Sequence, residues 1–195
     1  MPYPLIALTG YSRCGKDTAA DALVSIGYKR SCFGDIIKKM VDDASEKEWS
    51  KMHNWLEETG RGCDRISSIA NAWSLLKDIG HSPFTQADDV KAQLRPLLED
   101  YGIWKYEEVA ERFFESLPAK CVNSRLCRAD EGRMWRDRGG IIVKIVRPDN
   151  DAHTEVERRW IEELHEAALI DFVLHNEKDP AHLQGAIKKL AAGKL

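Results

Sequence analysis

The sequence predicts an α/β protein whose five-stranded parallel sheet is covered by helices on both faces. Short apolar segments alternate along the chain with segments of helical spacing, and parallel strands need crossover connections that are usually helices. The opening apolar segment is continuous, as expected for a strand that is buried on both faces. The strands are expected at residues 4–9, 28–33, 120–124, 141–146 and 169–174.

Helical spacing also divides the chain into a core and an insertion. Helices are expected at residues 16–26, 35–57, 130–138, 155–168 and 181–192. Residues 60–117 read as mostly helical without a strand signal, and this stretch is too long for one crossover. We therefore expect a single domain with a core at 1–41 and 118–195 and a helical lobe at about 42–117.

Composition limits the class of protein. The chain has 195 residues, 43% of them hydrophobic, and a net charge of -3, which argues against a general polyanion binder such as a nucleic-acid-coating protein. Its five cysteines show no disulfide or metal-ligand spacing, so we expect reduced thiols. Without a signal-peptide or membrane-span pattern, the expected location is the cytoplasm.

The stretch LTGYSRCGKDT, residues 8–18, carries the strongest functional motif. Gly10, Gly15 and Lys16 fit G-x-x-x-x-G-K, in which backbone N–H groups bind phosphate oxygens and the lysine reaches the β and γ phosphates. The motif follows a strand and begins a helix, whose positive dipole end favours an anion. We assign this loop, with Arg13 and Cys14 between the glycines, to ATP binding.

The residue after the lysine departs from the usual motif. Asp17 occupies the position where Ser or Thr commonly binds Mg2+, and Thr18 follows one residue later. A carboxylate is a suitable hard ligand for Mg2+, although it brings negative charge toward the phosphates. Asp17 is also the kind of first-turn acid that the helix dipole favours. The metal therefore has two candidate ligands, Asp17 and Thr18.

Arginines supply candidates for catalysis and for a lid. Arg125 and Arg128 follow the third strand, at the end of a sheet where α/β proteins bind ligands, and we interpret residues 125–138 as an arginine-bearing lid. Three further arginines of this stretch are expected to pair with acidic neighbours on the same helix: Arg133, Arg136 and Arg138. Arginine binds phosphate in a bidentate manner, which makes Arg95 and Arg112 of the helical lobe candidates too.

The motifs together resemble phage-type deoxynucleoside monophosphate kinases of the phosphate-loop (P-loop) kinase group. The similar stretches follow one order through nearly the whole chain: LTGYSRCGKDTAADAL, CFGDIIKK, LRPLLEDYG, SRLCRADEG, RGGIIVKIVRP and DFVLHNEKDPAHLQGAI. The resemblance implies a three-layer P-loop kinase fold. It also implies transfer of a phosphoryl group from ATP, with Mg2+, to a deoxynucleoside monophosphate, in the host cytoplasm if a phage encodes the chain.

The resemblance also assigns roles to residues. Gly10, Gly15, Lys16, Asp17 and Thr18 would hold ATP and metal, Arg95 would hold the acceptor phosphate, and Lys38 and Arg112 are weaker acceptor-side candidates. Arg125 and Arg128 would belong to the lid, and Arg147 and Asn176 to the adenine side.

Departures and rival functions stay open at this stage. The family tends to have Asp before the lid arginine, whereas this chain has Asn123, which puts metal binding or acceptor activation there in doubt. A kinase of another phosphorylated metabolite, such as dephospho-coenzyme A, shares the loop and the sheet. A nucleotide-binding regulator without phosphoryl transfer is the second alternative. The sequence does not fix the accepted bases or the oligomeric state, for which a homodimer is one candidate.

Overall fold

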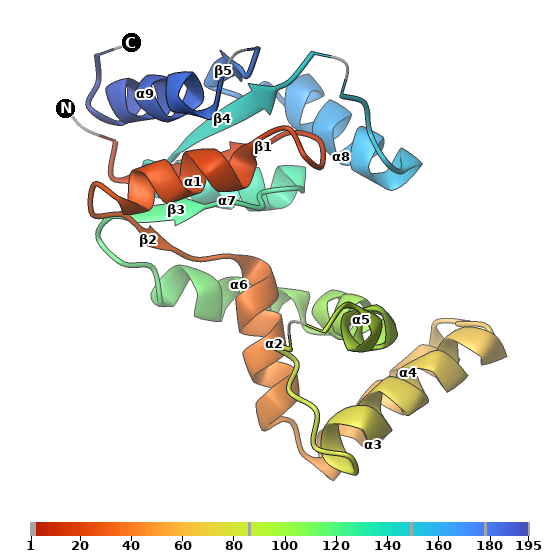
Figure 1. Ribbon diagram of the computed structural model, residues 1–195. Coiled ribbons are helices and arrows are strands. Elements are labelled where there is room, and N and C mark those ends of the chain that lie inside the picture. Colours follow the sequence, from red (N-terminus) through yellow and green to blue (C-terminus); the bar gives the residue numbers. More distant parts are fainter. Residues whose placement is uncertain (1–2, 86, 149, 178, 195) are drawn as a thin grey trace. The chain divides into compact units, whose positions relative to one another are not determined.

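The computed structural model describes residues 3–85, 87–148, 150–177 and 179–194. The chain forms two compact units (Figure 1): unit 1 comprises Met1–Cys32 with Ser116–Leu195, and unit 2 comprises Phe33–Glu115. The insertion therefore begins at Phe33, earlier than the lobe expected at about 42–117. Among the described helices, none combines the length and the apolar character that a bilayer crossing requires.

Unit 1 contains a five-stranded sheet in the order β2-β3-β1-β4-β5. Every paired neighbour runs parallel, which confirms the predicted fold class. The strands are β1 (Leu5–Thr9), β2 (Lys29–Arg30), β3 (Cys121–Asn123), β4 (Ile141–Val146) and β5 (Phe172–His175). The carboxyl end of β1 lies between those of β3 and β4, so the loop that follows it lies in the middle of the sheet edge where α/β proteins bind ligands.

Helices cover both faces of this sheet, as the contacts of β4 show. Successive side chains of a strand point to opposite faces, and those of β4 meet different helices on each face. Val143 and Ile145 belong to the core cluster formed with α1 (Lys16–Val24) and α9 (Pro180–Ala191), which lie side by side in Figure 1. Ile142 instead approaches Gly132 of α7 (Ala129–Asp137), together with Leu164 of α8 (Glu155–Glu166). The fold therefore has three layers, as predicted.

Helix α7 is packed into unit 1 over most of the range expected to form a lid. Trp135 is fully buried, and its Nε1 donates a hydrogen bond to the Ile141 carbonyl oxygen at 3.2 Å. Arg136, expected to pair within its own helix, reaches Asp171 instead, with 3.3 Å between Nη2 and Oδ1. The lid role stays a prediction, and it is best placed on residues 125–128, which precede the packed helix.

Two strands are shifted from their expected ranges. β2 is limited to Lys29–Arg30, because Phe33 already begins α2 (Phe33–Asp43). β5 begins three residues later than expected, at Phe172, because a left-handed turn at Ala168 (φ 50°) separates it from α8. Asp171 then fixes the start of β5, since its Oδ2 accepts a hydrogen bond from Ile142 N at 2.7 Å.

Unit 2 is helical throughout its regular elements, as predicted for the insertion. Its helices are α2, α3 (Glu46–Glu58), α4 (Cys63–Lys77), α5 (Asp88–Trp104) and α6 (Tyr106–Glu115). The single helix expected at 35–57 is two helices, because the Ser45 side chain caps a new start by accepting a hydrogen bond from Glu48 N at 3.3 Å. Phe33 stacks on Phe113 with ring centroids 4.2 Å apart.

A buried carboxylate ties three elements of unit 2 together. Asp100 on α5 is 2% exposed and accepts hydrogen bonds from Arg61 Nε at 3.0 Å and Arg65 Nε at 2.7 Å. Arg61 lies in the connection between α3 and α4, and Arg65 lies on α4. Two cations balance one buried anion here, so these arginines serve the packing of unit 2.

Candidate functional site: the phosphate loop

The loop after β1 has a backbone that requires its two glycines. Gly10 has φ +130° and Gly15 has φ +110°, values that residues with a Cβ rarely adopt. A Cβ on Gly10 would collide with the Ile145 carbonyl oxygen and the Cys14 sulfur, and one on Gly15 would lie 2.6 Å from Asn176 Nδ2. Neighbouring strands and their following residues therefore hold the loop in one conformation, which the two glycines of the motif make accessible.

Lys16 is folded back over the loop that precedes it. Its Nζ donates hydrogen bonds to the carbonyl oxygens of Gly10 at 2.7 Å and Tyr11 at 2.8 Å, and it lies 3.9 Å from Cys14 Sγ. Burial raises the pKa of the Cys14 thiol although the Lys16 charge opposes this effect. The ammonium group is thus held at the loop, where it can exchange backbone oxygens for phosphate oxygens.

The start of α1 offers backbone donors to an anion. Gly15 is the N-cap residue, and no side chain caps this end of the helix among the described residues. The first N–H groups of a helix have no partner within the helix, and its dipole is positive there. The arrangement therefore fits a phosphate group, which would accept these hydrogen bonds.

A cavity of about 330 Å³ opens beside this loop. Asn176, which follows β5, reinforces its wall by donating from Nδ2 to the Cys14 carbonyl oxygen at 2.9 Å. Seven of the residues that line the cavity were predicted from the sequence to bind ATP, and the eighth is Pro180. Its lining is Arg13, Gly15, Lys16, Asp17, Thr18, Arg147, Asn176 and Pro180.

Asp17 and Thr18 place two hard oxygen ligands on this cavity. The Asp17 side chain is 83% exposed, and Arg30 Nη1 lies 3.4 Å from Asp17 Oδ1 while Arg30 Nη2 pairs with Asp21 Oδ1 at 2.9 Å. Within the described residues, no cluster of three or more acidic, His or Cys side chains could hold a metal ion alone. This donor set fits Mg2+ that is held largely by nucleotide phosphates, and both residues stay candidates.

The loop after β3 contains the predicted catalytic arginines. Arg128 pairs with Asp130 through two hydrogen bonds, at 3.1 and 2.9 Å, whereas the Arg125 side chain is exposed. Asn123 is fully buried, and its Oδ1 accepts a hydrogen bond from Arg125 N at 3.0 Å. Asn123 therefore shapes the backbone that presents Arg125.

A buried carboxyl group supports the same loop. Glu131 accepts hydrogen bonds from Cys127 N at 3.3 Å and Arg128 N at 3.5 Å. Burial raises the pKa of Glu131 to about 7, and these two hydrogen bonds oppose the rise only in part. Near neutral pH this side chain is therefore divided between its protonated and ionised forms.

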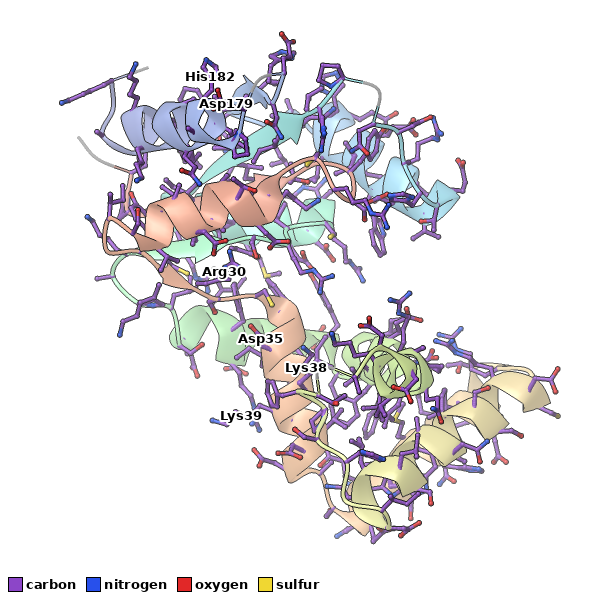
Figure 2. The ribbon with its side chains drawn as sticks, viewed as in Figure 1. Arg30, Asp35, Lys38, Lys39, Asp179 and His182 are labelled. Atoms are coloured by element: carbon purple, nitrogen blue, oxygen red, sulfur yellow. The ribbon has the colours of Figure 1, made fainter. Side chains whose placement is uncertain are left out.

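The expected acceptor-side cations all belong to unit 2 and differ in their surroundings. Lys38 and Asp35 both belong to α2 and are labelled in Figure 2. Lys38 Nζ lies 3.9 Å from Asp35 Oδ1 and 5.5 Å from the centre of the Phe84 ring. Arg112 on α6 pairs with Glu108 at 2.7 Å. Arg95 is exposed on α5.

Sequence analysis did not single out two residues that contact the loop. Glu157 and Asn150 bind Ser12, although they lie 145 and 138 positions away in the chain. Only the pattern Thr154 to Glu157, typical of a helix start, marks this region in the sequence. That pattern predicts a cap and gives no indication of a contact with the loop.

Comparisons with known proteins yield structural similarity without a sequence family. No family model matches the chain, and no curated protein does. A structure of dephospho-CoA kinase from Campylobacter jejuni covers 98% of this chain and 97% of its own, at 14% identity and a TM-score of 0.48. TT1252 from Thermus thermophilus covers 99% of each chain, at 18% identity and a TM-score of 0.49. Both TM-scores lie below 0.5, so neither structure assigns an activity to this chain.

Proposed function

We propose that the protein is a P-loop kinase that transfers a phosphoryl group from ATP to a small phosphorylated acceptor. The observation that carries this proposal is the glycine loop after β1, with Lys16 folded onto it and a cavity of about 330 Å³ beside it. The loop offers convergent backbone donors, a cation and an adjoining space, which are the features that a nucleotide's phosphates require.

The residues of the chain divide the work of transfer. Lys16 would exchange the Gly10 and Tyr11 carbonyls for oxygens of the outer phosphates and stabilise their developing charge. Arg125 and Arg128 are proposed to neutralise the transferred group, for which Arg128 must leave Asp130. Asp17 and Thr18 would hold Mg2+, which supplies charge neutralisation on the phosphates when bound. Arg147 and Asn176 would border the nucleoside.

The preferred acceptor is a deoxynucleoside monophosphate, as the sequence resemblance implies. Its attacking atom is a phosphate oxygen that is already ionised at neutral pH, so no general base is needed. Lys38, Arg95 and Arg112 of unit 2 are the proposed acceptor-phosphate ligands. Dephospho-coenzyme A is the second candidate, since the sequence leaves this acceptor open.

An acceptor panel tests the proposal. ADP release is measured with ATP, Mg2+ and each of dAMP, dGMP, dCMP, dTMP and dephospho-coenzyme A. Turnover with a deoxynucleoside monophosphate supports the preferred acceptor, and turnover with dephospho-coenzyme A alone assigns the alternative. ATP binding without turnover with any acceptor would instead favour a nucleotide-binding regulator.

We further propose that the protein works in the cytoplasm, that it has neither nucleic-acid nor membrane partners, and that a homodimer is its candidate assembly.

A further inference from the structure

Ser12, in the middle of the phosphate loop, has every polar group bound by one distant segment. Its N–H and its Oγ both donate to Glu157 Oε1, at 2.6 and 2.8 Å. Its carbonyl oxygen accepts a hydrogen bond from Asn150 Nδ2 at 2.9 Å. Residues 150 and 157 flank the start of α8, so the connection after β4 holds this part of the loop.

The Glu157 carboxyl group that accepts these hydrogen bonds from Ser12 is ionised. Burial tends to raise the pKa of this carboxyl group, but hydrogen bonds from His153 N and Ser12, with the nearby Lys16 charge, outweigh that effect and lower its pKa. The carboxylate is therefore ionised at neutral pH and lies within the field of the Lys16 ammonium. A charged acceptor also makes stronger hydrogen bonds than a neutral one.

This position is one that a phosphate would compete for. The N–H groups at the start of α1 suit the inner phosphates, and the lysine of such a loop reaches the β and γ phosphates. Glu157 binds the N–H of Ser12, three residues before Gly15, and lies close enough to Lys16 for that charge to help lower its pKa. A carboxylate and a terminal phosphate both carry negative oxygens, so they cannot share this donor without repulsion.

We propose that the Glu157 carboxylate is an internal occupant of the phosphate loop that the γ-phosphate of ATP displaces and that ADP leaves in place. The inference rests on the proposed function, because it needs a nucleotide in the loop. It makes Glu157 a determinant of the preference between triphosphate and diphosphate. ATP binding then frees the start of α8 from Ser12, whereas ADP keeps the contact.

Glu157 also has a structural role that must be separated from this one. Its N–H donates to Thr154 Oγ1 at 3.1 Å, and its Oε2 accepts from His153 N at 2.9 Å, which together cap α8. If capping were its whole role, a substitution would change stability and leave nucleotide preference unaltered. The ratio of two nucleotide affinities therefore separates the roles.

The test compares Glu157→Gln with Glu162→Gln, which removes the same charge from an exposed position on α8. Titration calorimetry with Mg2+ measures the dissociation constants of a non-hydrolysable ATP analogue and of ADP. In Glu157→Gln the affinity for the ATP analogue should rise about fivefold, because the neutral amide competes more weakly. ADP affinity should change less than twofold, and Glu162→Gln should resemble the unsubstituted protein for both nucleotides.

Amide NMR of the unsubstituted protein gives a second readout that needs no substitution. The Ser12 and His153 N–H signals should shift strongly with the ATP analogue and little with ADP. Equal effects of both nucleotides in calorimetry and NMR would overturn the inference while leaving the proposed function intact. If neither nucleotide binds the unsubstituted protein at millimolar concentration, the proposed function fails and this inference fails with it.

Discussion

The phosphate loop of unit 1 and the cationic side chains of unit 2 differ in what fixes them. The loop depends on backbone conformation at Gly10 and Gly15, and its consecutive residues necessarily stay together. The cations of unit 2 come from separate helices and have different partners, such as Glu108 for Arg112 and Asp100 for Arg65. A local motif therefore defines a site by itself, whereas scattered arginines acquire a role only through their partners.

The same contrast separates functional charge from structural charge. Lys16 is bound to carbonyl oxygens that a phosphate can replace. Arg61 and Arg65 are bound instead to the buried carboxylate of Asp100, which is a permanent part of the protein. Substitution of the first group should thus affect chemistry, and substitution of the second should affect folding.

Lys16→Ala should produce the largest effect on activity. Loss of a preorganised cation at the transferred phosphoryl group should lower kcat by about 10²–10³-fold. Lys29→Ala on β2 removes the same kind of charge from an exposed strand and should change kcat less than twofold. Steady-state ADP release checks both, and similar rates for Lys16→Ala and the unsubstituted protein would refute the role of the loop.

Asp100→Asn should produce the largest effect on stability. It leaves Arg61 and Arg65 facing a neutral amide, and breaking a buried ion pair from one side costs about 3 kcal/mol. Urea denaturation should report this loss in the free energy of unfolding. Glu99→Gln is the matched control, because Glu99 is exposed and pairs with Arg65 as a surface residue, so its cost should stay under about 1 kcal/mol.

Glu131→Gln should alter how stability depends on pH. The folded-state pKa of about 7 exceeds the ordinary 4.5, so the folded protein holds an extra proton between these values and loses stability as pH rises through them. The contribution amounts to about 3 kcal/mol by pH 8. Between pH 5 and pH 8, the free energy of unfolding of Glu131→Gln, measured by denaturation, should gain most of that amount over the unsubstituted protein. If the free energies of unfolding of Glu131→Gln and of the unsubstituted protein changed equally with pH, the raised pKa of Glu131 would be contradicted.

Arg95→Ala and Arg112→Ala sharpen the comparison within unit 2. If Arg95 holds the acceptor phosphate, its removal should raise the acceptor KM about tenfold and leave the ATP KM unchanged. Arg112 already pairs with Glu108 on its own helix, so its removal should raise the acceptor KM less than threefold. The opposite ranking, read from acceptor titrations, would transfer the proposed role to Arg112.

The sequence predicted the parts of the molecule that depend on neighbouring residues. The five parallel strands, the helical insertion and the glycine loop all follow from local patterns. It failed to predict the packing of α7, because a single buried Trp135 among charged residues gives little periodic signal. It also missed the contact between Ser12 and Glu157, since no local pattern links residues that are 145 positions apart.

The division of the expected helix at 35–57 has a similar explanation. Helix α2 ends at Asp43, and Ser45 caps α3 by accepting a single hydrogen bond from Glu48 N. Ser is tolerated within helices, so the residue type alone does not mark the break. The surrounding packing decides whether this stretch forms one continuous helix or the two helices α2 and α3.

The most direct test of the central claim follows the backbone amides of the phosphate loop by NMR as ATP and Mg2+ are added. The account predicts saturable shifts of the Gly15, Lys16 and Asp17 N–H signals, with much weaker binding in Lys16→Ala. Unchanged signals for these three residues at millimolar ATP would contradict it.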